Sequence, residues 1–181
     1  MHKTFATLTP LATLGPADTE ADTAELNDLY RGVIDGWNQG SGEAFAAGWA
    51  EDGHQIAFDG THFASRAEIA RFHDELFHTH LKGTRLVGQV TGVMFPAPDV
   101  AVLHARGTTI MPGATEPTPE RDSIQTVVAV RRQGDWRILA FHNTRVRPMG
   151  RDLPGTLWWL ISDWVYRLLV KASAAIRGAA R

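Results

Sequence analysis

Hydrophobic positions recur every three to four residues in the first third of the chain, which predicts amphipathic helices. The first helix is expected to begin near Asp22, because Glu25 three residues later completes a variant of the capping box. One face of this helix is apolar and the opposite face is polar. The apolar positions are Leu26, Leu29, Tyr30, Val33, Ile34 and Trp37.

Two shorter helices are predicted to follow. Ser41 is expected to cap a short second helix that turns Trp49 inward, and Asp52-Gly53 then reads as a turn. Ser65 and Glu68 form a full capping box, so a third helix is predicted from there to about residue 80. Its inner face consists of Ile69, Phe72, His73, Leu76 and His80, with Phe77 beside it.

The remaining pattern predicts strands. A small hairpin is expected over 54–59 and 61–64, with Asp59-Gly60 as its tight turn. Four long strands are expected near 84–95, 100–111, 121–132 and 136–147, separated by turn-forming residues. Short connections favour an antiparallel meander, so the fold class is α+β.

The last long strand is apolar on both faces, which predicts that something packs against each face. Trp136, Ile138 and His142 share one side if the strand alternates regularly, and Asn143 lies on the other. If Trp136 and Ile138 face inward, His142 does so too. Adjacency means that only one member of the His142-Asn143 pair can face an interior site.

Composition narrows the possible functions. The chain has 181 residues, 44% of them hydrophobic and 21% charged, with a net charge of −2. These values are ordinary for a soluble globular protein, and no basic stripe points to nucleic acid. The absence of cysteine excludes disulfides, thiolate chemistry and cysteine-based metal sites. Since no secretory signal is recognisable, a cytoplasmic protein is expected.

Both ends of the chain are expected to lie outside the compact domain. Residues 1–20 lack a hydrophobic period and read as a flexible leader, and residues 149–181 read as an amphipathic helical extension. The stretch Leu157 to Val170 is too short to span a membrane and contains Asp163 and Arg167. This helix is expected to pack on a protein partner or to meet a membrane surface.

Several segments of the chain resemble the nuclear-transport-factor-2-like superfamily, and within it the SgcJ/EcaC family. That family is related to the SnoaL-like polyketide cyclases and the ketosteroid isomerases. The resemblance covers about residues 22–147. It rests on Ile69–His73 with Leu76-Phe77, His80–Gly83, Pro98–His104, Gln125–Val128, Gly134–Ile138 and Phe141–Val146.

The resemblance implies a domain over 21–148 in which a cone-shaped, curved antiparallel sheet wraps around three helices, with the C-terminal amphipathic helix as an addition. An apolar pocket would open between the concave face of the sheet and the first and third helices. The convex face would form a homodimer, in agreement with the two-sided strand. Members are often named oxidoreductases, but this chain has no glycine-rich dinucleotide loop after a strand. No cofactor is therefore expected.

His73 has two interpretations. It is either a core histidine bonded to a backbone carbonyl or a pocket group that bonds or deprotonates a ligand. No metal is expected, because the histidines of the third helix are not spaced to share one face and no HExxH motif is present. His73 and His142 are the candidate catalytic residues. The candidate pocket residues are Tyr30, Trp37, Phe58, Phe77, His104, Gln125 and Asn143.

Two hypotheses of function follow. The first is cofactor-free proton transfer, of the isomerase or cyclase type, on an apolar oxygenated compound such as a polyketide. Ketosteroid isomerases use an Asp base with a Tyr and a protonated Asp. Tyr30 is a conceivable donor here, but the acids of that set are not recognisable, since Asp59 fits a turn. The second hypothesis is a non-catalytic ligand-binding or dimeric association module, because fold does not fix function.

Overall fold

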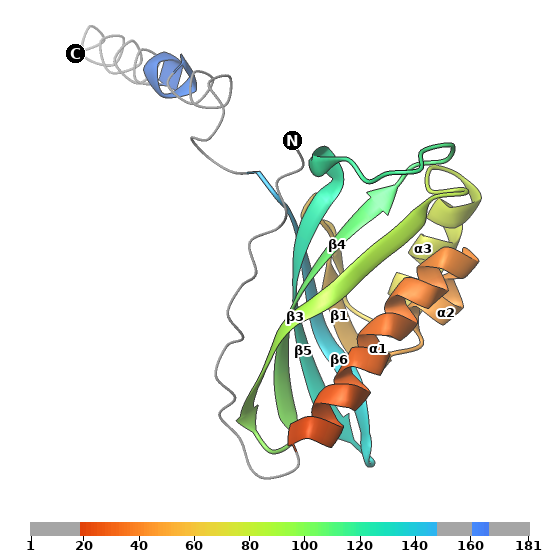
Figure 1. The fold of residues 1–181 in the computed structure, drawn as a ribbon, viewed down its shortest axis with the longest axis vertical. Helices are drawn as coiled ribbons and strands as arrows, with labels where there is room; N and C mark the ends of the chain where they lie inside the picture. Colours follow the sequence, from red (N-terminus) through yellow and green to blue (C-terminus); the bar gives the residue numbers. More distant parts are fainter. Residues whose placement is uncertain (1–18, 148–160, 167–181) are drawn as a thin grey trace, which may run out of the picture. The chain divides into compact units, whose positions relative to one another are not determined.

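The computed structural model describes residues 19–147 and 161–166. Figure 1 shows helices packed along a curved sheet. The helices are α1 (Thr19–Gln39), α2 (Gly42–Ala46) and α3 (Arg66–His78), with a 3₁₀ turn at Pro119–Arg121. The strands are β1 (Trp49–Ile56), β2 (His62–Phe63), β3 (Arg85–Ala97), β4 (Val100–Ile110), β5 (Asp122–Arg132) and β6 (Asp135–Arg145).

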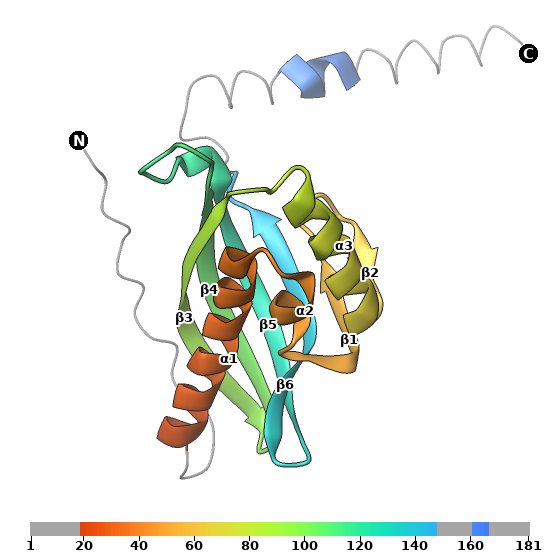
Figure 2. The same cartoon turned by 90° about the vertical axis from the view of Figure 1, so that its right-hand side faces the viewer.

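The six strands form one curved sheet in the order β2-β1-β6-β5-β4-β3, which confirms the predicted α+β class. The sheet is mixed rather than wholly antiparallel, because β1 runs parallel to β6 while all other neighbours are antiparallel. Figure 2 shows α1 crossing one face of the sheet, with α2 and α3 beside it. We call the helix-covered face the inner face and the opposite one the outer face.

The start of β1 differs from the sequence prediction. The second helix ends at Ala46, and Trp49 begins a strand instead of extending the helix. Asp52-Gly53 is not a turn: it lies within β1, where the pairing with β6 shifts register between Trp49 and His54. A Cβ on Gly53 would lie 2.7 Å from the Ile138 carbonyl oxygen, so this close approach of two strands requires glycine.

The local turn and capping signals are confirmed in three places. Ser41 Oγ accepts from the Ala44 N–H at 3.1 Å, and Ser65 Oγ accepts from the Glu68 N–H at 3.2 Å. Glu68 Oε2 accepts in return from the backbone N–H of residue 64 at 2.8 Å. Asp59 accepts from the Thr61 N–H at 3.0 Å in the predicted tight turn.

The first helix begins earlier than predicted, at Thr19, so Asp22 does not cap it. The Asp22 carboxylate instead forms an ion pair with Arg131, and it accepts from Trp136 Nε1 at 3.4 Å. The Arg131 guanidinium also lies 4.6 Å from the centre of the Trp136 ring. These contacts fasten the N-terminal part of α1 to the β5–β6 hairpin.

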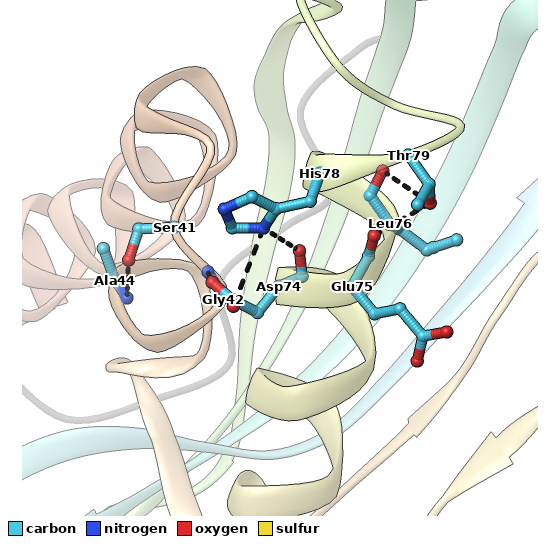
Figure 3. Close-up of polar contacts among 8 residues, drawn as sticks. All are labelled: Ser41, Gly42, Ala44, Asp74, Glu75, Leu76, His78 and Thr79. Atoms are coloured by element: carbon cyan, nitrogen blue, oxygen red, sulfur yellow. Dashed lines mark hydrogen bonds and ion pairs between the residues drawn. The ribbon is translucent and has the colours of Figure 1, made fainter.

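Two glycines let the three helices approach closely. A Cβ on Gly36 of α1 would lie 2.2 Å from the Phe45 nitrogen, and one on Gly42 would lie 2.0 Å from the Ala70 carbonyl oxygen. Figure 3 shows Gly42 beside Asp74 of α3, whose Oδ1 accepts from the Gly42 N–H at 3.3 Å. Side chains larger than hydrogen would force these helices apart.

The core fills the space between the helices and the inner face of the sheet. The largest fully buried side chains are Trp49, Leu26, Ile69, Leu103, Ile138 and Val127. They come from α1, α3 and four different strands, so the hydrophobic contacts hold both layers together.

The contacts divide the chain into a unit over 1–146 and a second unit over 147–181. Residues 161–166 of the second unit are helical. The first 18 residues of the predicted leader, and the rest of the predicted C-terminal extension, lie outside the described residues. In the part of the chain that the structure describes, no helix is long and apolar enough to cross a membrane.

Candidate functional site

A row of polar side chains crosses the mainly apolar inner face. Tyr30 comes from α1, Gln125 from β5 and Asn143 from β6. The Tyr30 hydroxyl donates to Gln125 Oε1 at 3.1 Å, and Gln125 Nε2 donates to Asn143 Oδ1 at 3.2 Å. Strand pairing sets Gln125 directly opposite Asn143, so both point to the same face. We call these three residues the inner polar row.

Glycines in β3 and β4 make room for the Tyr30 phenol. Gly88 and Gly107 are paired across these strands. A Cβ on Gly88 would lie 2.8 Å from the Tyr30 oxygen, and one on Gly107 would lie 3.6 Å from it. Burial raises the pKa of Tyr30 far above its ordinary value, because the charged phenolate would lose its hydration. Tyr30 is therefore a neutral hydrogen-bond donor at physiological pH.

Ser123 fixes the orientation of the central amide. Gln125 Nε2 also donates to Ser123 Oγ at 2.7 Å, and Ser123 Oγ donates to the Gly107 carbonyl at 3.1 Å. The outer end of the row is different, because Asn143 is only partly buried. Within residues 19–147 and 161–166, no group accepts a hydrogen bond from the Asn143 amide nitrogen. The row thus ends in an available donor.

His73 lies inside an aromatic cluster on α3. Its ring stacks on Phe45 with centroids 4.2 Å apart, and its Nδ1 donates to the Ile69 carbonyl at 2.8 Å. The other rings around it belong to Trp37, Phe63, Phe72 and Phe77. Desolvation lowers the pKa of His73 to about 4, while the bond to Ile69 acts in the opposite direction. The imidazole is therefore neutral at physiological pH, with its proton on Nδ1 and the lone pair on Nε2.

The orientation predicted for His142 is wrong. Trp136 and Ile138 do face inward, but His142 is exposed on the outer face while Phe141 and Asn143 turn inward. The pairing of β6 with β5 explains the change, because Ile138 and Ala140 oppose consecutive residues of β5. Leu139 is the extra residue of this β-bulge, and it reverses the alternation beyond it.

The other predicted pocket residues do not lie together. Trp37 and Phe77 join the aromatic cluster around His73, and Trp37 Nε1 donates to Thr84 Oγ1 at 3.1 Å. Phe58 is 56% exposed and lies 4.5 Å beneath the Arg145 guanidinium. His104 is on the outer face, where its cross-strand partner is Thr126. The structure therefore brings together Tyr30, Gln125 and Asn143, and separately His73, Trp37 and Phe77.

Three buried polar atoms without a hydrogen-bond partner were missed by sequence reasoning. Gln55 Oε1 and Trp49 Nε1 lie on β1, and Thr108 Oγ1 lies on β4. An unpaired buried acceptor or donor costs about 1–3 kcal/mol. The signal was hidden because the sequence placed Trp49 in a helix and broke β1 at Asp52-Gly53.

The buried polar side chains limit which reactions the inner face can support. In the described part of the chain the buried polar side chains are Gln55, His73, Thr84, Ser123 and Gln125, so no carboxylate lies among them. Nor do the described residues contain a group of three or more His, Asp or Glu placed to hold a metal ion. A hollow of about 270 Å³ lies between β2 and α3. It is lined by His62, Phe63, Glu68, Arg71, Phe72 and Glu75.

A curved six-stranded sheet packed against three helices is the nuclear-transport-factor-2-like class of fold. Within that class the chain belongs to the SnoaL-like domain family, whose sequence pattern matches residues 26–144. The match covers most of the described domain and includes the whole inner polar row. No curated protein matches the sequence.

Solved structures agree with this family. A domain of unknown function with a cystatin-like fold from Nostoc punctiforme is 34% identical, with a TM-score of 0.70, over 87% of this chain and 97% of that one. An uncharacterised protein of the same fold from Caulobacter vibrioides is 25% identical, with a TM-score of 0.60, over 70% of this chain and 90% of that one.

A third similar structure shows likeness of fold alone. It is described as a calcium/calmodulin-dependent protein kinase type II association domain from Thiobacillus denitrificans. It is 18% identical, with a TM-score of 0.58, over 66% of this chain and 93% of that one.

Proposed function

We propose that this protein binds a small, mainly apolar molecule that carries an oxygen atom, at the inner polar row. The observation that carries the proposal is the hydrogen-bonded series Tyr30–Gln125–Asn143 within an apolar inner face. Small-molecule sites combine apolar walls with a few placed polar groups. The SnoaL-like family supports the proposal, since it is part of a superfamily of small-molecule-binding and isomerase-type proteins.

The row offers specific hydrogen bonds to such a ligand. The Asn143 amide supplies a donor, and the neutral Tyr30 hydroxyl keeps oxygen lone pairs after donating to Gln125. Ser123 prevents the central amide from rotating. A carbonyl or hydroxyl oxygen of the ligand is the group that matches this end of the row.

Binding without catalysis is favoured over an isomerase of the ketosteroid type. That chemistry needs an ionised acid as base and a protonated acid as oxyanion partner. Among the described residues no carboxylate is buried on the inner face. The residues of the inner face are therefore better suited to bind a ligand through hydrogen bonds and apolar contacts than to transfer a proton.

Proton transfer by His73 is the second candidate, and one observation favours it. The pKa of about 4 leaves its Nε2 unprotonated at neutral pH. The Asp base of ketosteroid isomerase works with a pKa of about 4.6, so a base of this strength is not too weak in principle. The substrate would be an apolar oxygenated compound such as a polyketide.

Two further predictions from the sequence stay proposals. One is that the chain belongs to the SgcJ/EcaC family, and the other is that the protein is located in the cytoplasm.

Neighbouring residues on β6 provide a matched test. Ligands that co-purify with the protein are identified by native mass spectrometry, and the recovered compound is titrated into variants. Asn143→Leu should weaken binding by about tenfold or more, since it removes the hydrogen-bond donor at the end of the row, whereas His142→Leu should bind as the parent does. Equal affinity of both variants would refute the inner polar row as the binding site.

The catalytic candidate needs its own readout. If the identified compound is converted to an isomer, His73→Asn should abolish conversion while the ligand still binds. Conversion at the parent rate by a folded His73→Asn protein would eliminate His73 as the base. Absence of any conversion by the parent protein supports the binding function alone.

We also propose that the outer face pairs two copies of the chain, as a second function of the domain. Outward-facing apolar side chains from four strands lie in one row: Met94, Val102, Val128 and Ala140. These side chains are only partly buried in the single chain. A second copy placed against them would cover an apolar surface in the middle of the sheet.

A further inference from the structure

Two histidines contact one another at the edge of the sheet, away from the inner polar row. His54 of β1 and His62 of β2 are both exposed, and His54 Nδ1 lies 2.9 Å from His62 Nε2. Their ring planes differ by 22° and their centroids are 5.1 Å apart. Neither residue has been assigned to the proposed ligand site.

Strand pairing places these two side chains together. Ile56 of β1 is directly opposite His62 of β2, and His54 precedes Ile56 by two residues. Since side chains two apart share a face, His54 and His62 are diagonal neighbours on the outer face. β2 is the edge strand of the sheet, so the pair is open to solvent on that side.

The nitrogen separation suits a metal ion. Imidazole nitrogens bind first-row transition metals at about 2.0–2.1 Å, so two nitrogens at right angles around one ion lie about 2.9 Å apart. In the metal-free pair a single shared proton satisfies both nitrogens. Because both side chains are exposed, small rotations bring the two lone pairs onto one ion without any change in the core.

We propose that His54 and His62 form a two-histidine site for a divalent transition-metal ion. Imidazole ligands suit Cu²⁺, Ni²⁺ and Zn²⁺, and Cu²⁺ binds most tightly to a given nitrogen site. Since the described residues include no group of three placed ligands, water completes the coordination. The bound ion links the edge strand β2 to β1. No residue of the inner polar row takes part in this metal site.

The test is a calorimetric titration of the metal-free protein with Ni²⁺ and Cu²⁺, after removal of any purification tag. All proteins carry His2→Ala, so that the histidine at position 2 does not contribute to copper binding. His54→Ala and His62→Ala are compared with His104→Ala, which removes an outer-face histidine from β4. Circular dichroism confirms that each variant is folded.

We expect one saturable site in the parent protein. Each of the two single variants should lower the association constant by about tenfold or more, and His104→Ala should leave it unchanged. Electron paramagnetic resonance of the Cu²⁺ complex should show coupling to two nitrogens. The proposal is overturned if the double variant His54→Ala/His62→Ala binds as tightly as the parent, or if His104→Ala has an equal effect.

Discussion

The Tyr30 hydroxyl donates to Gln125 Oε1 at 3.1 Å, and this bond joins the middle of α1 to the centre of the sheet. The two residues are 95 positions apart in the sequence. Both side chains are about 95% buried, with exposures of 5% and 4%. The bond therefore contributes to stability as well as to the proposed ligand site.

Removing the hydroxyl tests this contribution. Tyr30→Phe leaves Gln125 Oε1 without its donor in a buried place, so we expect the free energy of unfolding to fall by about 1–3 kcal/mol. Urea denaturation measures the change. Tyr166→Phe is the matched control, because Tyr166 is 67% exposed, and it should change stability by less than about 0.5 kcal/mol. Equal stability of Tyr30→Phe and the parent would contradict the expected role of this bond.

The space above Gly88 should be equally sensitive. Gly88→Ala puts a Cβ 2.8 Å from the Tyr30 oxygen and 2.7 Å from the Arg106 carbonyl oxygen, which we expect to cost about 1–3 kcal/mol. Gly92→Ala on the same strand is the control, since its Cβ meets nothing within 4 Å. Thermal unfolding of both variants compares the two sites. A lower melting temperature for Gly92→Ala than for Gly88→Ala would contradict the packing described around Tyr30.

The buried His73 should make the free energy of unfolding depend on pH. Its pKa is about 4 in the folded protein against an ordinary 6.5, so the unfolded chain binds more protons between these values. The free energy of unfolding should therefore fall as the pH drops from about 6.5 to about 4, by up to about 3 kcal/mol. Above pH 6.5 the His73 imidazole is neutral in both the folded and the unfolded chain, so none of this stability is lost.

The variant His73→Phe isolates that dependence. It should lose the part of the acid sensitivity that belongs to His73, as measured by urea denaturation at pH 7 and pH 4.5. His78→Gln, which changes an exposed histidine of α3, should keep the parent's slope. An identical pH dependence for His73→Phe and the parent would show that the buried imidazole does not control acid stability.

The proposed outer-face dimer is tested by placing a charged side chain in its interface. Val128 lies in the middle of the outward apolar row, opposite Val102 and Ala140. Val128→Arg should convert a dimer into monomers, because an arginine in this position would lose water without a partner. Sedimentation velocity measures the mass. Glu116→Arg in an exposed loop is the control, and a parent protein that is already monomeric would rule out the interface.

Local signals predicted much of the fold because they act between residues close in sequence. The Ser41 and Ser65 caps form as their sequence motifs predict. The four long strands begin and end within about two residues of their predicted limits, since turn-forming residues separate them. The apolar residues predicted on the inward faces of α1 and α3 are buried or partly buried, as their hydrophobic period predicts. His80, which was also predicted on the inward face, is exposed, because α3 ends at His78.

Long-range pairing decided what these signals could not. The parallel pairing of β1 with β6 made the sheet mixed and drew Asp52-Gly53 into a strand instead of a turn. An Asp-Gly pair has the same local preference in either setting. Only the approach of the Ile138 carbonyl shows why glycine is needed at position 53.

The His142-Asn143 pair shows most clearly which features the sequence determines and which the tertiary structure decides. The sequence by itself determined that the two side chains lie on opposite faces, because adjacent residues of a strand always do. Which of them faces the interior depended on the tertiary structure. The extra residue Leu139 reverses the alternation, and a bulge exists only relative to the partner strand β5. That one residue places Asn143 beside Gln125 and leaves His142 on the outer face.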